Sequence, residues 1–197
     1  EYIMSPKDLC TIDFLDQLLD TGIVVMKIEG RGRAPEYVKT VIECYREAID
    51  AYYDKSYNEE KVADWMARLG AVYNRGFWSG YYLGKEIGEW SKGHGSQATT
   101  RKIYLGKITN YYAKLGVAEC QMESHSFKQG DKILIMGATT GVLEEEVGEI
   151  RVDDAAVLES KKGDMCSFKV GDKVRPSDKL YKVVPVEQEV EVEHAHH

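Results

Sequence analysis

Apolar residues recur at helical spacing in three stretches of the first half of the chain. The first stretch begins at Ser5, a good N-cap residue followed by Pro6, and ends at Gly22. Pro35 opens the second stretch, and Asn58 caps the third. The apolar positions are Leu9, Ile12, Leu15, Leu18 and Leu19, then Val38, Val41, Ile42, Tyr45, Ala48, Ile49 and Tyr52, then Val62, Trp65, Met66 and Leu69. This spacing predicts three amphipathic helices.

Residues 23–29 follow a different pattern, in which apolar and other side chains alternate. Val24, Met26 and Ile28 alternate with Val25, Lys27 and Glu29, which predicts a strand with one apolar face. The other face ends in a Lys/Glu pair. In α/β folds the chemistry gathers at the carboxyl ends of strands. The pattern therefore predicts that Lys27 and Glu29 line one wall of an active site.

The second half of the chain consists of short β-like runs separated by glycine turns. Residues 88–100 are small and polar, which predicts a linker before these runs. Phe127–Ile133 and Phe168–Val174 repeat a Phe-Lys-x-Gly-Asp-Lys pattern, in which a Gly-Asp turn leads into an apolar strand. Short strands at regular spacing predict a small closed antiparallel barrel. We therefore expect domains at 1–95 and 101–186, followed by a disordered acidic and His-rich tail at 187–197.

Composition narrows the class of protein. The 197 residues carry a net charge of −7, which argues against a nonspecific nucleic-acid binder. No run of 18 apolar residues occurs, and the start lacks a basic-then-apolar secretory signal, so we expect no membrane partner. Four cysteines lie far apart without a CxxC pair, which favours a reducing cytoplasm.

The first half resembles a known family in several separate segments. These are Tyr2–Cys10, Met26–Arg31 (Met-Lys-Ile-Glu-Gly-Arg), Tyr37-Val38, Tyr45–Asp50, Asn74–Phe77 (Asn-Arg-Gly-Phe) and Gly80. They are similar to the collagenase-like peptidases, numbered family U32 among peptidases, whose catalytic type is unassigned. The resemblance implies a modified (β/α)₈ barrel in the full-length protein, with this chain supplying its last strand and following helices.

The resemblance also implies functions and a cofactor. Some members of the family are described as peptidases or collagenases, and others hydroxylate the wobble uridine of tRNA with prephenate. Several of the latter carry an iron–sulfur cluster held by cysteines. The family's upstream signature, rich in Cys, Gly and Ser, is absent from this sequence. We therefore expect this chain by itself to be non-catalytic and without a cofactor, and an iron–sulfur cluster to belong to the full-length protein.

The second half resembles domain 2 of translation elongation factors. The matching segments are Gly106–Thr109, Lys114–Ala118, Gly130–Ile133, Gly137–Gly141, Lys169–Arg175 and Lys179–Val183. This resemblance implies a β-barrel that contacts RNA, ribonucleoproteins or neighbouring domains. The fold class expected for the whole chain is therefore α+β: the α-rich end of a (β/α)₈ barrel followed by a small antiparallel β-barrel.

Three residues near the predicted strand are the catalytic candidates. Glu29 could orient or deprotonate a substrate group, and Lys27 lies beside it on the same face. Arg31, and Arg33 after it, could clamp a carboxylate or phosphate, because a guanidinium donates two parallel hydrogen bonds. The structural alternatives are a Lys27–Glu29 salt bridge at a strand end and solvated charge at Arg33.

Other residues are candidates for cofactor or substrate binding. The resemblance places Cys10 where cluster-binding members have their last ligand, whereas a buried apolar thiol is the structural alternative. Arg75, Phe77 and Trp78 could stack on unpaired bases, or the aromatic residues could cover a domain interface. Lys128, with Lys107, Lys114 and Lys132, could contact tRNA phosphates or simply form a solvated face.

The sequence thus leaves three functions open. The main expectation is that this chain is the substrate-binding and scaffolding part of an enzyme that hydroxylates tRNA wobble uridine. The alternative enzyme is a collagenase-like peptidase acting on protein substrates. The non-enzymatic alternative is an RNA- or protein-binding module. The expected partners are tRNA or a protein substrate, together with an upstream barrel domain of the same protein.

Overall fold

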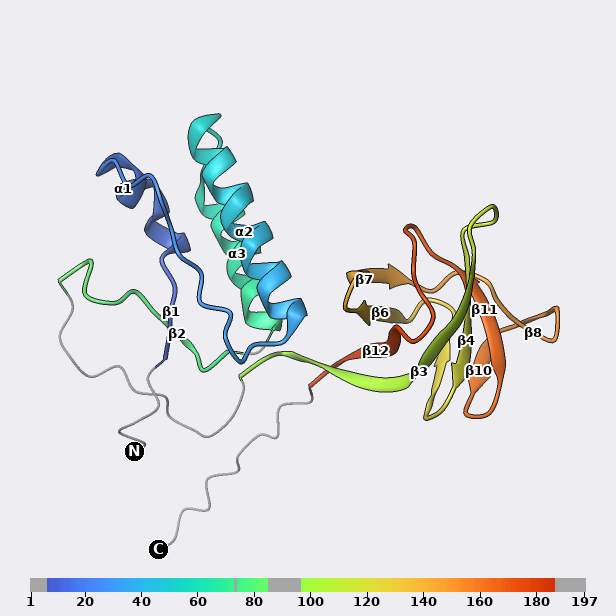
Figure 1. Ribbon diagram of the computed structural model, residues 1–197. Coiled ribbons are helices and arrows are strands. Elements are labelled where there is room, and N and C mark those ends of the chain that lie inside the picture. Colours follow the sequence, from blue (N-terminus) through green and yellow to red (C-terminus); the bar gives the residue numbers. More distant parts are fainter. Residues whose placement is uncertain (1–6, 73, 85–96, 187–197) are drawn as a thin grey trace, which may run out of the picture.

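The computed structural model describes residues 7–72, 74–84 and 97–186, which form two units joined by a strand pair (Figure 1). The helical unit comprises the described residues up to 84, and the sheet unit comprises residues 97–186. Each has its own buried cluster of apolar side chains. The class is therefore α+β, as the sequence predicts. The tail 187–197 and most of the predicted linker lie outside the described residues.

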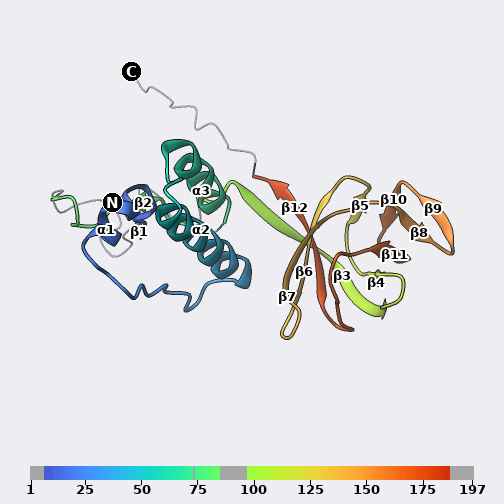
Figure 2. The same ribbon diagram turned by 90° about the horizontal axis from the view of Figure 1, so that it is seen from above.

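The helical unit is built on two packed helices, α2 (Pro35–Tyr53) and α3 (Glu59–Ala71). Pro35 occupies the first turn of α2, and the Asn58 side chain accepts a hydrogen bond from Lys61 N at 2.9 Å to cap α3. Both predicted helices are thus confirmed. Their apolar stripes meet the short 3₁₀ helix η1 (Ile12–Phe14) and α1 (Leu15–Asp20) in a common core. Figure 2 shows α2 and α3 side by side from above.

The helix predicted over residues 5–22 is wrong in its first part. Asp8–Leu9 form strand β1, which pairs in parallel with β2 (Phe77–Trp78). The helical spacing is overridden by pairing with a segment distant in sequence, which no local pattern reveals. Ser5 and Pro6 lie outside the described residues. Gly22, with φ of +83°, ends the helical part as predicted.

The strand predicted over residues 23–29 is absent from the described structure. This segment has no regular structure, and Val24 and Val25 are 93% and 79% exposed. A strand needs a neighbour for its backbone N–H and C=O groups, and none of the described segments pairs with residues 23–29. The alternating pattern is present, but residues 23–29 join none of the sheets in the described part of the chain.

The sheet unit is an eight-stranded antiparallel sheet in the order β7-β6-β12-β3-β4-β11-β8-β9, with a second pair formed by β5 and β10. The strands are β3 (Thr100–Tyr112), β4 (Val117–Met122), β5 (Ser126–Lys128), β6 (Lys132–Gly137), β7 (Gly141–Glu146), β8 (Ile150–Val152), β9 (Ala155–Val157), β10 (Glu159–Lys161), β11 (Met165–Lys169) and β12 (Lys179–Pro185). The end strands β7 and β9 are not paired with each other. The antiparallel strands are as predicted, whereas closure into a barrel stays a prediction.

The two copies of the Phe-Lys-x-Gly-Asp-Lys pattern meet in the core of the sheet unit. The rings of Phe127 and Phe168 lie 5.6 Å apart in an edge-to-face arrangement, and both are fully buried. The first copy leads through Gly130 into β6, as predicted. The second does not lead into a strand: Val174 is buried in a loop, and β12 begins at Lys179. Burial of an apolar side chain does not require a strand.

The two units are connected by β3 and β12, whose outer ends extend toward the helices (Figures 1 and 2). Thr100 Oγ1 donates to Ala71 O at 2.7 Å, so β3 starts against the end of α3. Lys39 of α2 lies 3.5 Å from Glu144 of β7, and Lys102 lies 2.5 Å from Glu36. In the described part of the chain, no helix has the length and apolar character needed to cross a membrane.

Candidate functional site

The β1–β2 pair brings together several residues that the sequence singles out. Asp8 pairs with Phe77 and Leu9 with Trp78. At the end of the pair, Cys10 N donates to Trp78 O at 2.9 Å. Cys10, Phe77 and Trp78 are therefore neighbours, although the sequence suggested separate roles for them. Arg75 belongs to the same site through its backbone.

The half-buried carboxylate of Asp8 organises the start of this pair. Its Oδ1 accepts from Arg33 Nη2 at 2.5 Å, and its Oδ2 accepts from Arg75 N at 2.9 Å. The guanidinium carbon of Arg33 lies 4.9 Å from the centre of the Tyr37 ring. The Asp8 and Arg33 side chains are only 18% and 16% exposed. Arg33 is thus an ion-pair partner inside the fold, and the prediction of solvated charge there is wrong.

Cys10 is a buried thiol at the carboxyl end of β1. Its side chain is in contact with two others: Tyr45 Oη donates to Cys10 Sγ at 3.9 Å, and the thiol points at Met66 Sδ, also at 3.9 Å. The residue is 6% exposed, and burial raises the pKa of the Cys10 thiol. The thiol is therefore neutral at pH 7, which matches the structural alternative that the sequence left open.

The described residues do not fit an iron–sulfur cluster on their own. Such a cluster needs about four thiolates, and the site contributes one, Cys10. Cys44 directs its thiol at Trp65 O within the helical core, and the other two cysteines lie in the sheet unit. Among the described residues no group of three or more His, Cys, Asp or Glu could hold a metal ion.

The three catalytic candidates lie on the exposed segment after α1. Glu29 Oε1 accepts from Arg31 N at 2.7 Å, which closes a local turn. Lys27 is exposed, and the described structure contains no Lys27–Glu29 salt bridge. Whether these residues act in catalysis stays a prediction. The structure brings only Arg33 of this segment into the β1–β2 site.

Lys128 lies apart from the other substrate-binding candidates, in β5 of the sheet unit. Its backbone N donates to Asp131 Oδ2 at 2.8 Å, and its side chain is exposed. Lys107, from the same proposed basic strip, lies 3.1 Å from Glu123. The substrate-binding candidates are thus divided between the two units.

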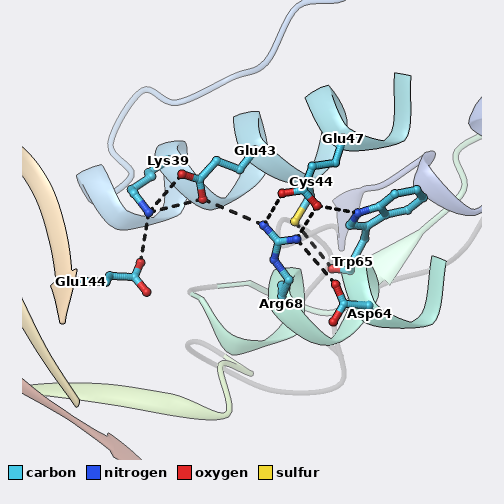
Figure 3. Close-up of polar contacts among 8 residues, drawn as sticks. All are labelled: Lys39, Glu43, Cys44, Glu47, Asp64, Trp65, Arg68 and Glu144. Carbon is cyan, nitrogen blue, oxygen red and sulfur yellow. Dashed lines mark hydrogen bonds and ion pairs between the residues drawn. The ribbon is translucent and has the colours of Figure 1, made fainter. Parts of the chain in front are cut away.

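A network of charged residues, which the sequence analysis did not find, runs from the helical core to the sheet unit (Figure 3). Arg68 of α3 donates two hydrogen bonds to Glu47 of α2, at 2.6 and 2.9 Å, and Trp65 Nε1 donates to the same carboxylate. These hydrogen bonds, led by those from Arg68, lower the pKa of Glu47. The i,i+4 spacing of Asp64 and Arg68 was visible in the sequence, but the contacts between helices were not.

The network reaches the sheet unit through one lysine. Lys39 Nζ lies 3.1 Å from Glu43 and 3.5 Å from Glu144. Burial lowers the pKa of Lys39, but the carboxylates of Glu43 and Glu144 outweigh that effect and raise it overall. Lys39 is therefore a cation that links α2 to β7.

Comparison with known proteins identifies one family and two kinds of relative, collagenases and tRNA hydroxylation proteins. Residues 1–92 match the model of peptidase family U32. The chain is 53% identical over 182 residues to a collagenase of Porphyromonas gingivalis, covering 92% of this chain and 44% of that protein. It is 28% identical over 184 residues to tRNA hydroxylation protein P1 of Bacillus subtilis, covering 92% of this chain and 43% of that protein.

A solved structure is similar in part. It is described as the C-terminal domain of a Geobacillus thermoleovorans U32 peptidase and is 20% identical, with a TM-score of 0.39, covering 40% of this chain and 90% of that chain. The chain spans about half the length of the curated relatives it matches.

Proposed function

Because this chain belongs to peptidase family U32, we propose that it is the substrate-binding and scaffolding part of a collagenase-like peptidase that acts on protein substrates. The observation that carries the proposal is the 53% identity to a collagenase over 92% of the chain. The tRNA hydroxylation protein that matches over the same share of the chain is 28% identical. Relatedness thus favours the peptidase over the tRNA hydroxylase that the sequence analysis preferred.

Two observations support the proposal that this chain is part of a longer protein: the length of its relative and the exposure of residues 23–29. The named collagenase is more than twice as long as the region it shares with this chain. Residues 23–29 alternate as a strand does, yet Val24 and Val25 are exposed and no strand among the described residues pairs with them. We propose that in a longer protein this segment is a strand of a (β/α)₈ barrel, and that the sheet unit closes as a small barrel beside it.

This placement gives roles to the candidate residues. As a barrel strand, residues 23–29 would carry Lys27 and Glu29 to the carboxyl end where substrate is bound. Arg31 would follow them as a donor to a substrate carbonyl or carboxylate. The Asp8–Arg33 ion pair would fix the neighbouring backbone, since it joins β1 to the segment after residue 30. Cys10 would be a buried packing residue there.

Binding to denatured collagen tests the proposal. The purified chain is passed over immobilised gelatin and over an immobilised tRNA anticodon stem-loop, at the same ionic strength. We expect retention on gelatin, no cleavage of it by this chain alone, and weaker retention on RNA. Tighter binding to the stem-loop than to gelatin would overturn the proposal, as would no binding to gelatin.

The tRNA hydroxylase remains the second candidate, favoured by one observation. The match to the Bacillus subtilis protein extends over 184 residues and so includes both units. In that case Cys10 would supply one ligand of an iron–sulfur cluster, and the other ligands would come from the rest of the longer protein. A cytoplasmic location, expected from the cysteine content, suits either candidate and stays a prediction.

A further inference from the structure

A groove in the sheet unit has walls made by two pairs of antiparallel strands. One wall consists of Ile103 of β3 with Lys182 and Val184 of β12, and Ile103 is directly opposite Lys182. The other consists of Ser126 of β5 and Lys161 of β10, which are also directly opposite each other. His125 and Lys162 complete the lining, and the cavity volume is about 510 Å³.

The groove carries positive charge in a protein whose net charge is −7. Lys182 is held by Asp131 at 2.7 Å, and it contributes its aliphatic stem more than its charge. Lys161 lies 3.7 Å from Glu159, with both side chains well exposed, so this pair is weak. The lysines open to a ligand are thus Lys161 and Lys162, at one edge of the groove.

The wall formed by β3 and β12 is mainly aliphatic. Ile103 and Val184 are half-buried, and they lie on the same face of the strand pair as Lys182. His125 is held beside them, because its Nδ1 lies 3.2 Å from Tyr104 O, which can only accept. A ligand in this groove meets aliphatic side chains in the middle and ammonium groups at the edge.

We propose that this groove binds an extended polypeptide segment in which acidic and aliphatic side chains alternate. An extended segment places alternate side chains on opposite sides, one set toward the aliphatic wall and the other toward Lys161 and Lys162. Single-stranded RNA is the less suitable ligand, because its bases stack on aromatic rings and the lining offers a single ring, the imidazole of His125. That the ligand is a polypeptide rests on the proposed function.

The chain itself contains a sequence of the required pattern, which provides the probe. Residues 187–193 read Glu-Gln-Glu-Val-Glu-Val-Glu. A fluorescein-labelled peptide of this sequence is titrated with the full chain, and its anisotropy is measured. The same titration is made with a chain ending at Val186, which retains every described residue and lacks the competing segment. We expect saturable binding, at least as tight to the shorter chain.

Charge-reversed variants locate the binding. Lys161→Glu with Lys162→Glu removes the ammonium groups at the edge, whereas Lys169→Glu with Lys173→Glu makes the same change in net charge away from the groove. We expect the first pair to weaken binding about tenfold or more and the second less than about twofold. A Val184→Ser variant should weaken binding severalfold without a change in net charge.

Three outcomes would overturn the inference. They are equal loss in both charge-reversed pairs, equal binding of a peptide with Gln in place of every Glu, and tighter binding of a decauridylate than of the peptide. Gelatin binding is measured on the same proteins. Gelatin binding without peptide binding overturns the groove assignment alone. Peptide binding without gelatin binding overturns the proposed peptidase role alone.

Discussion

The Glu47 carboxylate shows how a single residue can hold two helices together. It accepts from Trp65 Nε1 and from both terminal nitrogens of Arg68, so one side chain of α2 binds two residues of α3 (Figure 3). Most surface ion pairs contribute little to the free energy of folding, but an Arg–carboxylate pair with two parallel hydrogen bonds has the geometry that makes a measurable contribution. The stability of the helical unit should therefore depend on the charge of Glu47.

The lowered pKa of Glu47 predicts a pH dependence with a definite sign. A carboxyl group whose pKa is lower in the folded state stabilises the fold above its unfolded pKa of about 4.3. That contribution is lost as the pH falls through the folded pKa. Glu47→Gln should therefore lower stability at pH 7 and have little effect at pH 2, measured by urea unfolding. Glu146→Gln, an exposed control, should change neither value.

The cysteines predict a second residue-level result. All four are buried, and burial raises the pKa of Cys10 and raises that of Cys44 to about 11. Since a reagent must reach a thiolate, a thiol reagent at pH 7.5 should label the native chain slowly and the urea-unfolded chain rapidly at all four positions. At Cys166 the slow labelling follows from burial alone, because the hydrogen bond with Cys120 lowers the pKa of Cys166. Mass spectrometry counts the adducts. Rapid native labelling of Cys10 would contradict the buried-thiol assignment.

At the residue scale, a contact could be predicted from the sequence only where its two partners are close together in the chain. Asn58 was recognisable as a cap because its partner, Lys61 N, is three residues away. Asp8 was assigned to a helix, and its real partners, Arg33 and the Arg75 amide, are distant in sequence. The groove was not predicted either, since only folding brings residues of β10 and β12 to the same lining. Residue types and short spacings were available, but the pairing of distant segments was not.

Helices and strands differ in the same way at the scale of elements. α2 and α3 follow from their own apolar stripes and start signals, because helix hydrogen bonds are internal. The segment 23–29 has the alternation of a strand, but a strand is stabilised by its neighbours and this one has none among the described residues. Conversely, β1 is a strand where a helix was expected, because β2 is there to pair with it. Local pattern determined the helices, whereas long-range pairing determined the strands.

The start of α3 provides a test at this scale. Asn58→Ala removes the side-chain acceptor for Lys61 N and should destabilise the helical unit by about 1 kcal/mol. Asn58→Asp keeps an acceptor at the same place and should restore most of that stability. Thermal unfolding followed by circular dichroism near 222 nm measures both. Equal losses in the two variants would show that the side-chain acceptor is not what stabilises the start of α3.

The pairing of β3 with β4 depends on a glycine. A Cβ atom at Gly106 would lie 2.0 Å from Gln121 O, a backbone atom that cannot move aside by rotating a side chain. Gly106→Ala should therefore disrupt the sheet unit and leave the helices folded, as seen by two-dimensional NMR. Gly148→Ala is the matched control, because no atom lies within 4 Å of its added Cβ. A native-like spectrum for Gly106→Ala would contradict the close approach.

At the scale of the whole molecule, ion pairs set how the two units are held. Lys39–Glu144 and Lys102–Glu36 both join α2 to the sheet unit. A solvent-accessible pair such as Lys39–Glu144 contributes about 0.2–1 kcal/mol and weakens with salt. The Lys102–Glu36 pair is more shielded, since its side chains are 31% and 18% exposed, and salt weakens it less. The arrangement of the units should therefore depend on ionic strength, while each core remains folded.

A double variant tests that dependence. Lys39→Gln with Lys102→Gln should increase the radius of gyration measured by small-angle X-ray scattering at low salt, and high salt should do the same to the unmodified chain. Lys169→Gln with Lys173→Gln makes the same charge change away from this contact. If both double variants scatter identically to the unmodified chain at low salt, the ion pairs do not hold the units.

The strand pair between the units has a consequence for how the molecule comes apart. Residues 100–102 of β3 pair with residues 183–185 of β12. Neither β4 nor β6 reaches this stretch, so the sheet is only two strands wide here. Two strands alone are marginally stable in water. Amide hydrogens here should exchange through local opening, long before those of either core. The strand pair between the units can thus open while both units stay folded, so the two units behave as separate cooperative folding units.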